Sequence, residues 1–337
     1  MSNLNSVEKT SPPTRSLAIR RGRLEFAGKD ITMHIFLALV VIGLAAIANP
    51  LTDGVFFTAN NFTNLMRQMT TTGLLSLGML FVVLTGGIDL SVGSVVAFSA
   101  IVAAGATVNY GLPIWASFLL GIITGAFWGL VNGFLVAKFK LAPFVVTLAS
   151  MTLIRGLTYV YSEIAISASS VPGFTTLGSV VAFGVPISSM IMILFFVLGA
   201  VFLNRTPLGR STIAIGGNSE TVRLAGISVL KGITTAYVIS GICSGVGGVL
   251  LASRLGNVQP SLGGSFELDA IAACVIGGAN LAGGKGTVQG TVVGVLILAV
   301  LNNLLSLRNV DSFWQLVLKG IIIIAVVLLH SRSQKRK

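Results

Sequence analysis

Long apolar runs, separated by short polar loops, set the tightest limit on what this chain can fold into. A membrane-spanning helix needs about 20 predominantly apolar residues, within a range of about 17–25. Only 9% of the 337 residues are charged, which is too few to cover a water-facing surface. We therefore predict an all-α, polytopic membrane protein with about ten transmembrane helices. The predicted spans are 31–48, 69–86, 91–109, 112–136, 141–161, 185–203, 233–252, 268–283, 287–306 and 313–329.

The positions of lysine and arginine predict the orientation of these spans. Cytoplasmic loops of membrane proteins carry an excess of both residues. With ten spans and the first residue inside, 17 of the 22 lysines and arginines fall on the cytoplasmic side. Both termini are thus predicted to be cytoplasmic, with basic tails over 1–30 and 331–337 around a transmembrane domain over 31–330. The net charge of +12 follows this pattern, so we expect a lipid bilayer around the chain and no nucleic-acid partner.

The longest predicted cytoplasmic loop, 204–232, is polar and basic. We expect one small surface helix in it. Asn218 is a favourable N-cap, Glu220 lies in the first turn where the helix dipole stabilises a negative charge, and Gly226 can end the helix. The loop is either a docking surface or an ordinary basic loop with an incidental helical turn. Its basic residues are Arg205, Arg210, Arg223 and Lys231.

The helix expected in this loop also has a short apolar edge, formed by Leu224 and Ile227. On the opposite side of the membrane, the longest predicted connections are 163–184 and 253–267. An extracytoplasmic partner is expected to land on these two outer loops.

Two glycine-rich turns interrupt the predicted spans, at 86–91 and 277–281. Irregular backbone at membrane depth is tolerated only where protein or a water-filled cavity covers it. The stretches 82–97 and 274–290 also echo each other: an apolar span, a Gly-Gly turn, Asp or Asn followed by Leu, and a glycine-spaced helix. The echo is either an internal repeat, as in many transporters, or a chance likeness of glycine turns.

Glycines recur at spacings of three or four in two predicted spans. Small residues on one helix face allow the backbones of two helices to approach closely. We favour close helix packing over the alternative of a flexible gate. The glycines are Gly121, Gly125 and Gly129 in one span and Gly241, Gly245 and Gly248 in the other.

No catalytic constellation is present in the sequence. The stretch 283–287 superficially resembles a phosphate-binding loop, but Gly286 stands where Ser or Thr must follow the lysine, and Ala279 stands where the first glycine belongs. We therefore predict that the chain is not an enzyme and binds no nucleotide, metal or other cofactor itself. If the chain takes part in ATP-driven transport, a separate subunit binds the ATP.

Ionisable residues inside predicted spans are functional candidates by default. We expect Asp89 and Asp269 to cap the helices beside them more readily than to contact substrate. Arg155 either pairs with Glu163 or Glu267 or lines a polar path, and Lys319 is expected to extend toward the membrane surface. So few buried charges favour a neutral polar substrate. Amide and aromatic candidates to contact it are Asn132, Asn302, Asn303, Phe127, Trp128, Phe313 and Trp314.

Five stretches, in order, resemble the membrane permease subunits of bacterial ABC importers for monosaccharides of the ribose, xylose, arabinose and galactose type, with the ribose type nearest. They are LTGGIDLSVGSVVA (84–97), VNGFLVAKFKLAPFVVTLASMTLIRGLTYVYS (131–162), TPLGRSTIAIGGNSETVRLAGI (206–227), FELDAIAACVIGGANLAGGKGTVQGT (266–291) and LNNLL (301–305). The likeness extends over about 35–330.

This resemblance implies a subunit of a bacterial inner-membrane importer that moves a monosaccharide, such as ribose, into the cytoplasm by alternating access. Two permease chains, expected to be identical, would form the pathway. Two ATPase subunits would bind ATP and Mg, and an extracytoplasmic protein would deliver the sugar. Thr221 and Val222 depart from the alanines common in the family's ATPase-coupling helix. That helix corresponds here to Asn218, Glu220, Arg223, Leu224, Ala225, Gly226 and Ile227.

Two other classes of function remain as alternatives. A stand-alone secondary transporter or channel for a small neutral solute would need no ATPase, but the scarcity of buried carboxylates leaves ion coupling little to act on. An intramembrane enzyme or scaffold has no catalytic motif to support it.

Overall fold

The computed structural model describes residues 39–311, 313–322 and 324. The predicted basic tails at 1–30 and 331–337 lie outside the described residues, as do parts of the first and last predicted spans.

Helices dominate the described structure. Six are long and apolar enough to cross a membrane, so the chain is a multi-pass membrane protein: α2 (Ala59–Leu84), α4 (Ile114–Phe139), α5 (Pro143–Tyr161), α7 (Ile187–Arg205), α10 (Val229–Leu255) and α12 (Val288–Leu307). Shorter apolar helices cover Leu39–Leu51, α3 (Val92–Val108) and Phe313–Ile322. The remaining helical elements are η1 (Val55–Phe57), α6 (Thr176–Ser179), α8 (Pro207–Gly217), α9 (Ser219–Leu224) and α11 (Phe266–Ile276).

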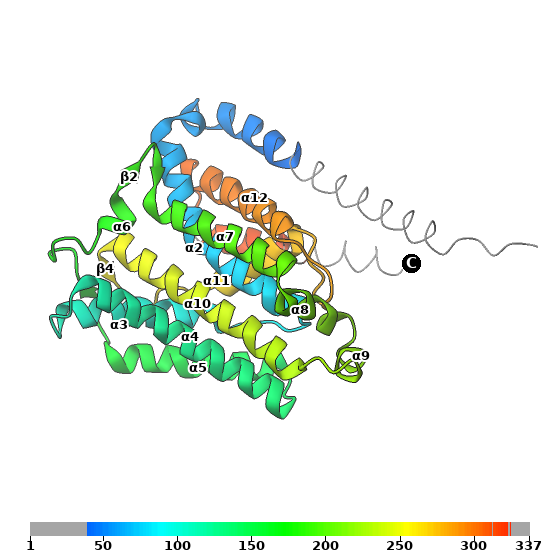
Figure 1. Cartoon of the computed structure of the whole chain (residues 1–337). Helices are drawn as coiled ribbons and strands as arrows, with labels where there is room; N and C mark the ends of the chain where they lie inside the picture. The colour runs from blue at the N-terminus through cyan, green and yellow to red at the C-terminus, as the bar shows by residue number, and fades with distance from the viewer. Residues whose placement is uncertain (1–38, 312, 323, 325–337) are drawn as a thin grey trace, which may run out of the picture.

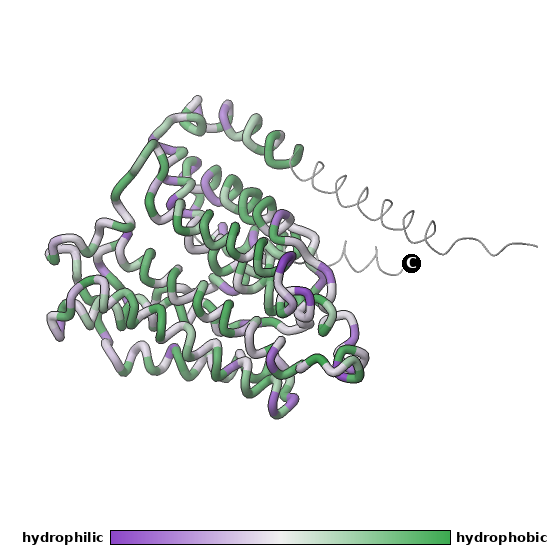
Figure 2. Tube along the Cα trace, in the orientation of Figure 1, coloured by the Kyte–Doolittle hydropathy of each residue, from purple (hydrophilic) through white to green (hydrophobic). Residues whose placement is uncertain are grey.

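Helix α10 runs through the middle of the bundle (Figure 1). On one side it packs against α3 and α4, with α5 beyond them. On the other side it packs against α2, which in turn contacts α7, α11 and α12. Apolar residues line the helices, and the more polar residues gather at their ends and in the connections (Figure 2). This arrangement fits a bundle whose lateral surface faces lipid.

Glycines join α4 to α10 along a seam of touching backbones, as the spacing of small residues predicted. A Cβ added at Gly125 would lie 2.4 Å from the carbonyl oxygen of Gly241, and one added at Gly129 would lie 2.3 Å from the carbonyl oxygen of Tyr237. Atoms cannot approach so closely without a shift of the backbone. Helices α4 and α10 can therefore pack this way only because these positions lack side chains.

Helix α2 begins at Ala59, ten residues before the predicted start at 69. Its first turns are polar, which hides them from a count of apolar residues. The Thr58 side chain caps the helix by accepting a hydrogen bond from the Asn61 amide N–H at 3.3 Å. The Asn61 side chain in turn exchanges two hydrogen bonds with Asn303 of α12, at 3.0 and 2.8 Å. Polar side chains paired in this way are readily accommodated in a buried helix.

The two glycine-rich turns lie against each other. Helix α2 ends at Leu84, and α11 ends at Ile276 after only 11 residues. The Gly284 N–H donates to the Leu84 carbonyl at 3.0 Å, which joins the second turn region to the end of α2. Gly87, Asp89 and Ala279 in these segments are buried by the surrounding protein, whereas Gly86 and Ala282 are exposed.

Two small antiparallel sheets at one end of the bundle depart from the all-α prediction. Strand β1 (Ile166–Ser167) pairs with β4 (Asn257–Val258), and β2 (Val181–Ala182) pairs with β3 (Val185–Pro186). The first sheet joins the two predicted outer loops.

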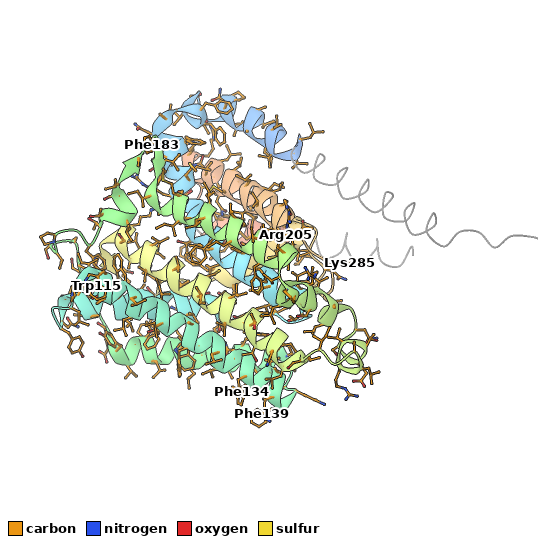
Figure 3. All side chains as sticks on the ribbon, viewed as in Figure 1. Trp115, Phe134, Phe139, Phe183, Arg205 and Lys285 are labelled. Carbon is orange, nitrogen blue, oxygen red and sulfur yellow. The ribbon has the colours of Figure 1, made fainter. Side chains whose placement is uncertain are left out.

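The labelled residues separate the two ends of the bundle (Figure 3). Trp115 and Phe183 lie at the end that carries these small sheets, whereas Arg205, Lys285 and Phe139 lie at the opposite end. Arg205 and Lys285, which the sequence predicts to face the cytoplasm, thus lie at the same end of the bundle.

Candidate functional site

The connection between α7 and α10 folds into two helices, α8 and α9, so the prediction of a single helix is wrong. Thr206 caps α8 by accepting a hydrogen bond from the Gly209 N–H at 3.0 Å. Helix α8 ends at Gly217 because Asn218 is extended, with a φ of −162°. The predicted loop 204–232 is also shorter than expected, since α7 continues to Arg205 and α10 begins at Val229.

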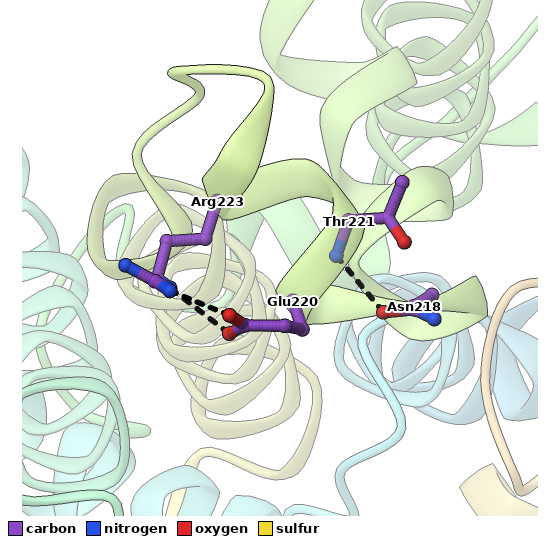
Figure 4. Close-up of polar contacts among 4 residues, drawn as sticks. All are labelled: Asn218, Glu220, Thr221 and Arg223. Atoms are coloured by element: carbon purple, nitrogen blue, oxygen red, sulfur yellow. Dashed lines mark hydrogen bonds and ion pairs between the residues drawn. The ribbon is translucent and has the colours of Figure 1, made fainter.

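Helix α9 has the caps that the sequence predicts (Figure 4). The Asn218 side chain accepts a hydrogen bond from the Thr221 N–H at 2.9 Å. At the other end, the Gly226 N–H donates to the Arg223 carbonyl and the Ile227 N–H donates to the Val222 carbonyl, with Gly226 at a φ of +78°. This pair of bonds is a Schellman motif. A helix of six residues is thus fixed at both ends by local contacts.

The solvent-exposed face of α9 carries both charged and apolar side chains. The Arg223 Nε donates to a Glu220 carboxylate oxygen at 2.9 Å (Figure 4), and this hydrogen bond lowers the pKa of Glu220 below its usual 4.5 and raises that of Arg223. The Leu224 side chain is 74% exposed and Ile227 is 44% exposed. Only Val222 is buried among the residues of α9. Exposed apolar side chains beside an ion pair are suited to contact with another protein.

A cluster of glycines connects α8 to both glycine-rich turns. A Cβ added at Gly216 would lie 1.9 Å from the Leu84 carbonyl oxygen and 2.5 Å from the Gly284 nitrogen. One added at Gly283 would lie 2.9 Å from the nitrogen of Gly86. We refer to Leu84, Gly86, Gly216, Gly283 and Gly284 as the glycine junction. Because α9 follows α8 directly, the junction lies next to the surface that α9 presents.

Asp89 organises a buried polar network near the first turn. Its carboxylate accepts hydrogen bonds from the Ser91 N–H at 3.1 Å and the Ser91 Oγ at 2.6 Å, and from the Ser240 Oγ at 2.9 Å. The predicted capping role is therefore indirect, since Ser91 precedes α3. Asn132 donates to the Ser91 Oγ at 2.9 Å and accepts from Ser150. The network ties α4, α5 and α10 to one turn.

Arg155 holds an outer loop and does not form the predicted pair with Glu163 or Glu267. Its Nη1 donates to the carbonyls of Pro260 and Leu262, at 3.0 and 2.6 Å. Glu267 lies in the first turn of α11 and carries the opposite charge nearby. The guanidinium therefore binds the backbone of the outer loop at Pro260 and Leu262.

Lys319 pairs with Asp269 at 2.9 Å. Asp269 lies within α11, whose N-cap is Ser265, so the prediction that Asp269 caps this helix is wrong. The extension of Lys319 toward the membrane surface stays a prediction. Of the other pathway candidates, Asn303 is occupied by Asn61, and Asn302 lines a polar pocket together with Asp269. The ionisable and amide candidates thus lie in separate groups and do not line one common path.

The aromatic candidates are placed on outer faces. Phe127, Phe313 and Trp314 are exposed, and Trp128 stacks edge-on against Phe127. Sequence reasoning missed Gln68, Thr72 and Arg254, which share the pocket of Asp269 and Asn302. Polar residues recurring every three or four positions in the first half of α2 were the available signal.

Comparison with known proteins gives a consistent result. Residues 61–327 match the family model described as the permease component of the branched-chain amino acid transport system. The ribose import permease protein of Bacillus subtilis is 44% identical over 323 residues, covering 95% of this chain and 99% of the relative. The ribose import permease protein of Escherichia coli K12 is 40% identical, covering 88% and 93%. The L-arabinose transport system permease protein of the same organism is 36% identical, covering 89% and 91%. No solved structure matches the chain.

Proposed function

We propose a function from the premise that this chain belongs to the branched-chain amino acid transport system permease family: it forms the membrane pathway of an ABC importer. The family description and the names of the relatives point to different substrates, so membership alone does not fix what is carried. The relatives named above are permeases for ribose and for L-arabinose, and each matches nearly the whole length of both chains. We therefore propose a monosaccharide, and a pentose such as ribose in particular.

The proposed importer needs three kinds of partner. ATPase subunits bind ATP and Mg and dock on the cytoplasmic side, against Asn218, Glu220, Arg223, Leu224, Ala225, Gly226 and Ile227. An extracytoplasmic sugar-binding protein contacts the outer loops. A second copy of this chain completes the pathway. This arrangement belongs to a bacterial inner membrane, with ten spans and both termini in the cytoplasm. The chain itself hydrolyses nothing and binds no nucleotide.

Alternating access requires ATP to favour one arrangement of the pathway over another. A ligand shifts an equilibrium only if it interacts differently with the two states. In the proposed mechanism, the ATPases move α9 when they close on ATP. Helix α8 passes this movement to the glycine junction, and from there to the turns between α2 and α3 and between α11 and α12.

One observation carries the coupling proposal: the exposed, capped helix α9 is joined through α8 to both glycine-rich turns by contacts between backbones. Side chains can change rotamer when two helices move, which would absorb the movement. The backbone of Gly216 lies directly against the Leu84 carbonyl, so a movement of α8 displaces the end of α2 as well.

The test is transport in liposomes. The chain is reconstituted with its ATPase and with a sugar-loaded binding protein, and uptake of radiolabelled ribose is measured with and without ATP. We expect uptake only with ATP, and ATP hydrolysis that rises when loaded binding protein is added. Arabinose and xylose serve as parallel substrates. Uptake of none of the three sugars would refute a pentose importer.

The same preparation separates the importer from a secondary transporter. Uptake that persists in ATP-depleted vesicles and collapses on addition of an uncoupler would contradict the ABC assignment. Recovery of the tagged chain from its native membrane with a bound ATPase would support it.

A further inference from the structure

A polar pocket lies between α2, the end of α10, α11, α12 and the 313–322 helix. Its volume is about 230 Å³. Two larger cavities of about 370 and 390 Å³ flank α7 and are lined almost wholly by apolar side chains, as expected of grooves that face lipid. The polar pocket differs in kind. Among the residues that line it are Gln68, Thr72, Arg254, Asp269, Asn302 and Lys319.

The pocket is open at one rim and closed at its floor. Gln68 and Arg254 are exposed, whereas Thr71 and Asp269 are each only 6% exposed. Arg254 is the second-last residue of α10, at the end of the bundle that carries strand β4. The rim therefore lies toward the predicted outer face, where a solute would arrive.

The polar groups of the pocket include donors and acceptors. The Asp269 carboxylate accepts from the Lys319 Nζ at 2.9 Å. Among the described residues, no donor reaches the buried Oδ1 of Asn302. An amide side chain carries two donors and an acceptor, so Asn302 and Gln68, which both line the pocket, offer both kinds of group to a ligand. A hydroxyl group both donates and accepts, and a ring bearing several hydroxyls matches a wall of amides, a carboxylate and cations.

Size and shape narrow the ligand further. At about 30 Å³ for each water molecule, the pocket has the volume of roughly seven to eight waters. That is below the roughly 300–1,000 Å³ of pockets for larger ligands. Phe266 adds an aromatic surface to the lining. A sugar ring has an apolar face that can pack on such a ring.

We infer that this pocket binds a single uncharged monosaccharide inside the membrane domain, between its release by the binding protein and its passage to the cytoplasm. Hydroxyl groups of the sugar bond to Asn302, Gln68 and Asp269, and Phe266 packs on the ring. This inference rests on the proposed function, because it takes the carried solute to be a sugar.

The test measures the number of sugars moved per ATP hydrolysed in proteoliposomes that contain the whole importer. The variants are Gln68→Leu, Asn302→Leu and the nearly isosteric Thr72→Val. We expect each leucine variant to lower the ratio at least tenfold, and Thr72→Val to lower it about threefold. The matched control is Gln289→Leu, which lies on α12 in an apolar groove and is exposed. The control is expected to keep the wild-type ratio.

The outcomes distinguish this inference from the proposed function. If the wild-type importer moves pentoses and all three variants keep its number of sugars per ATP, the pocket assignment is wrong and the importer assignment stands. If the wild type moves no pentose, the proposed function fails first. Should the leucine variants fail to assemble, Thr72→Val still decides. Its ratio must fall, and the relative uptake of ribose, arabinose and xylose must change. An unchanged order of preference together with an unchanged ratio would overturn the inference.

Discussion

The seam between α4 and α10 and the pair α8–α9 use glycine in different ways. Along the seam, Gly125 and Gly241 bring two long helices into backbone contact, and both helices are fixed along their length. In α8–α9, Gly209 packs closely against the end of α7, and Gly216 makes close contact at the junction with the two turns. Beyond it, Gly217 and Gly226 have no neighbour within 4 Å of an added Cβ. The difference indicates a rigid body to which one exposed helix is attached through a small area.

The largest effect is expected where the seam is disturbed. In Gly125→Ala, the added methyl would lie 2.4 Å from the Gly241 carbonyl oxygen and 2.8 Å from the Gly245 backbone. Because backbone must move, we expect destabilisation of about 1–3 kcal/mol. Thermal unfolding of the purified chain in detergent measures it. The control is Gly156→Ala, whose Cβ meets nothing within 4 Å. There alanine should stabilise the helix slightly. Equal unfolding temperatures for the two variants would show that the seam does not restrict the fold.

A loss of coupling, in addition to a loss of stability, is expected at the glycine junction. Gly216→Ala would place a methyl 1.9 Å from the Leu84 carbonyl oxygen, whereas Gly217→Ala meets nothing within 4 Å. The neighbouring pair is therefore a matched test. We expect Gly216→Ala to separate α8 from the turns and to lower ATP-driven uptake about tenfold, with Gly217→Ala close to wild type. Similar uptake by both variants would remove the junction from the coupling path.

The third prediction tests the exposed part alone. Glu220→Lys replaces the partner of Arg223 by a like charge, while the fold of the bundle is untouched because both side chains are 63% exposed. We expect unchanged unfolding temperature and at least a tenfold loss of sugar uptake. Gly226→Asp should act similarly, since Asp tolerates the φ of +78° and open space surrounds it.

Matched controls for these two changes lie on the predicted outer side. Asp53→Lys reverses the charge of an exposed acid outside the two predicted outer loops, and Gly54→Asp changes a glycine with a φ of +81° and open surroundings. Both should transport normally. Normal transport by Glu220→Lys would instead show that the ATPase does not dock on α9.

The smallest expected effect is a pH dependence confined to α9. The folded-state pKa of Glu220 is lowered by the hydrogen bond from Arg223. The ionised Glu220 therefore contributes fully to the stability of α9 at pH values above its ordinary pKa of 4.5. This stabilisation is lost as the pH falls through the lowered pKa of Glu220 in the folded protein. Hydrogen exchange of the α9 amides should show weaker protection in acid. In Arg223→Gln this dependence should disappear. The same dependence in both proteins would mean that another group is responsible.

Local features of this structure could be predicted from the sequence, and long-range partners could not. The caps at Asn218 and Gly226 depend on residues within one or two turns, and the α4–α10 seam follows from glycine spacing. The partner of Asp269 is 50 residues away, at Lys319, so nothing local identifies it. The polar first turns of α2 were misread because Asn61 is paired by Asn303, at a separation of 242 residues.

The break between α8 and α9 shows a similar limit. Gly216 and Gly217 lower the helix propensity of the segment that forms α8, so the sequence does not predict a helix there. Glycine is needed at position 216 because Leu84 and Gly284, from two distant segments, pack directly against it. The sequence near Gly216 does not indicate these contacts. The pocket beneath Arg254 is assembled in the same way, from five separate helices.

The short sheet of β1 and β4 has a mechanical consequence. It links the connection after α5 to the connection after α10, with a further bond from the Ala168 N–H to the Gly256 carbonyl at 2.7 Å. Arg155 of α5 also grips the segment that follows β4. The two outer loops are therefore mechanically joined. A force that another protein applies to either loop is transmitted to both α5 and α10, which lie in different parts of the bundle.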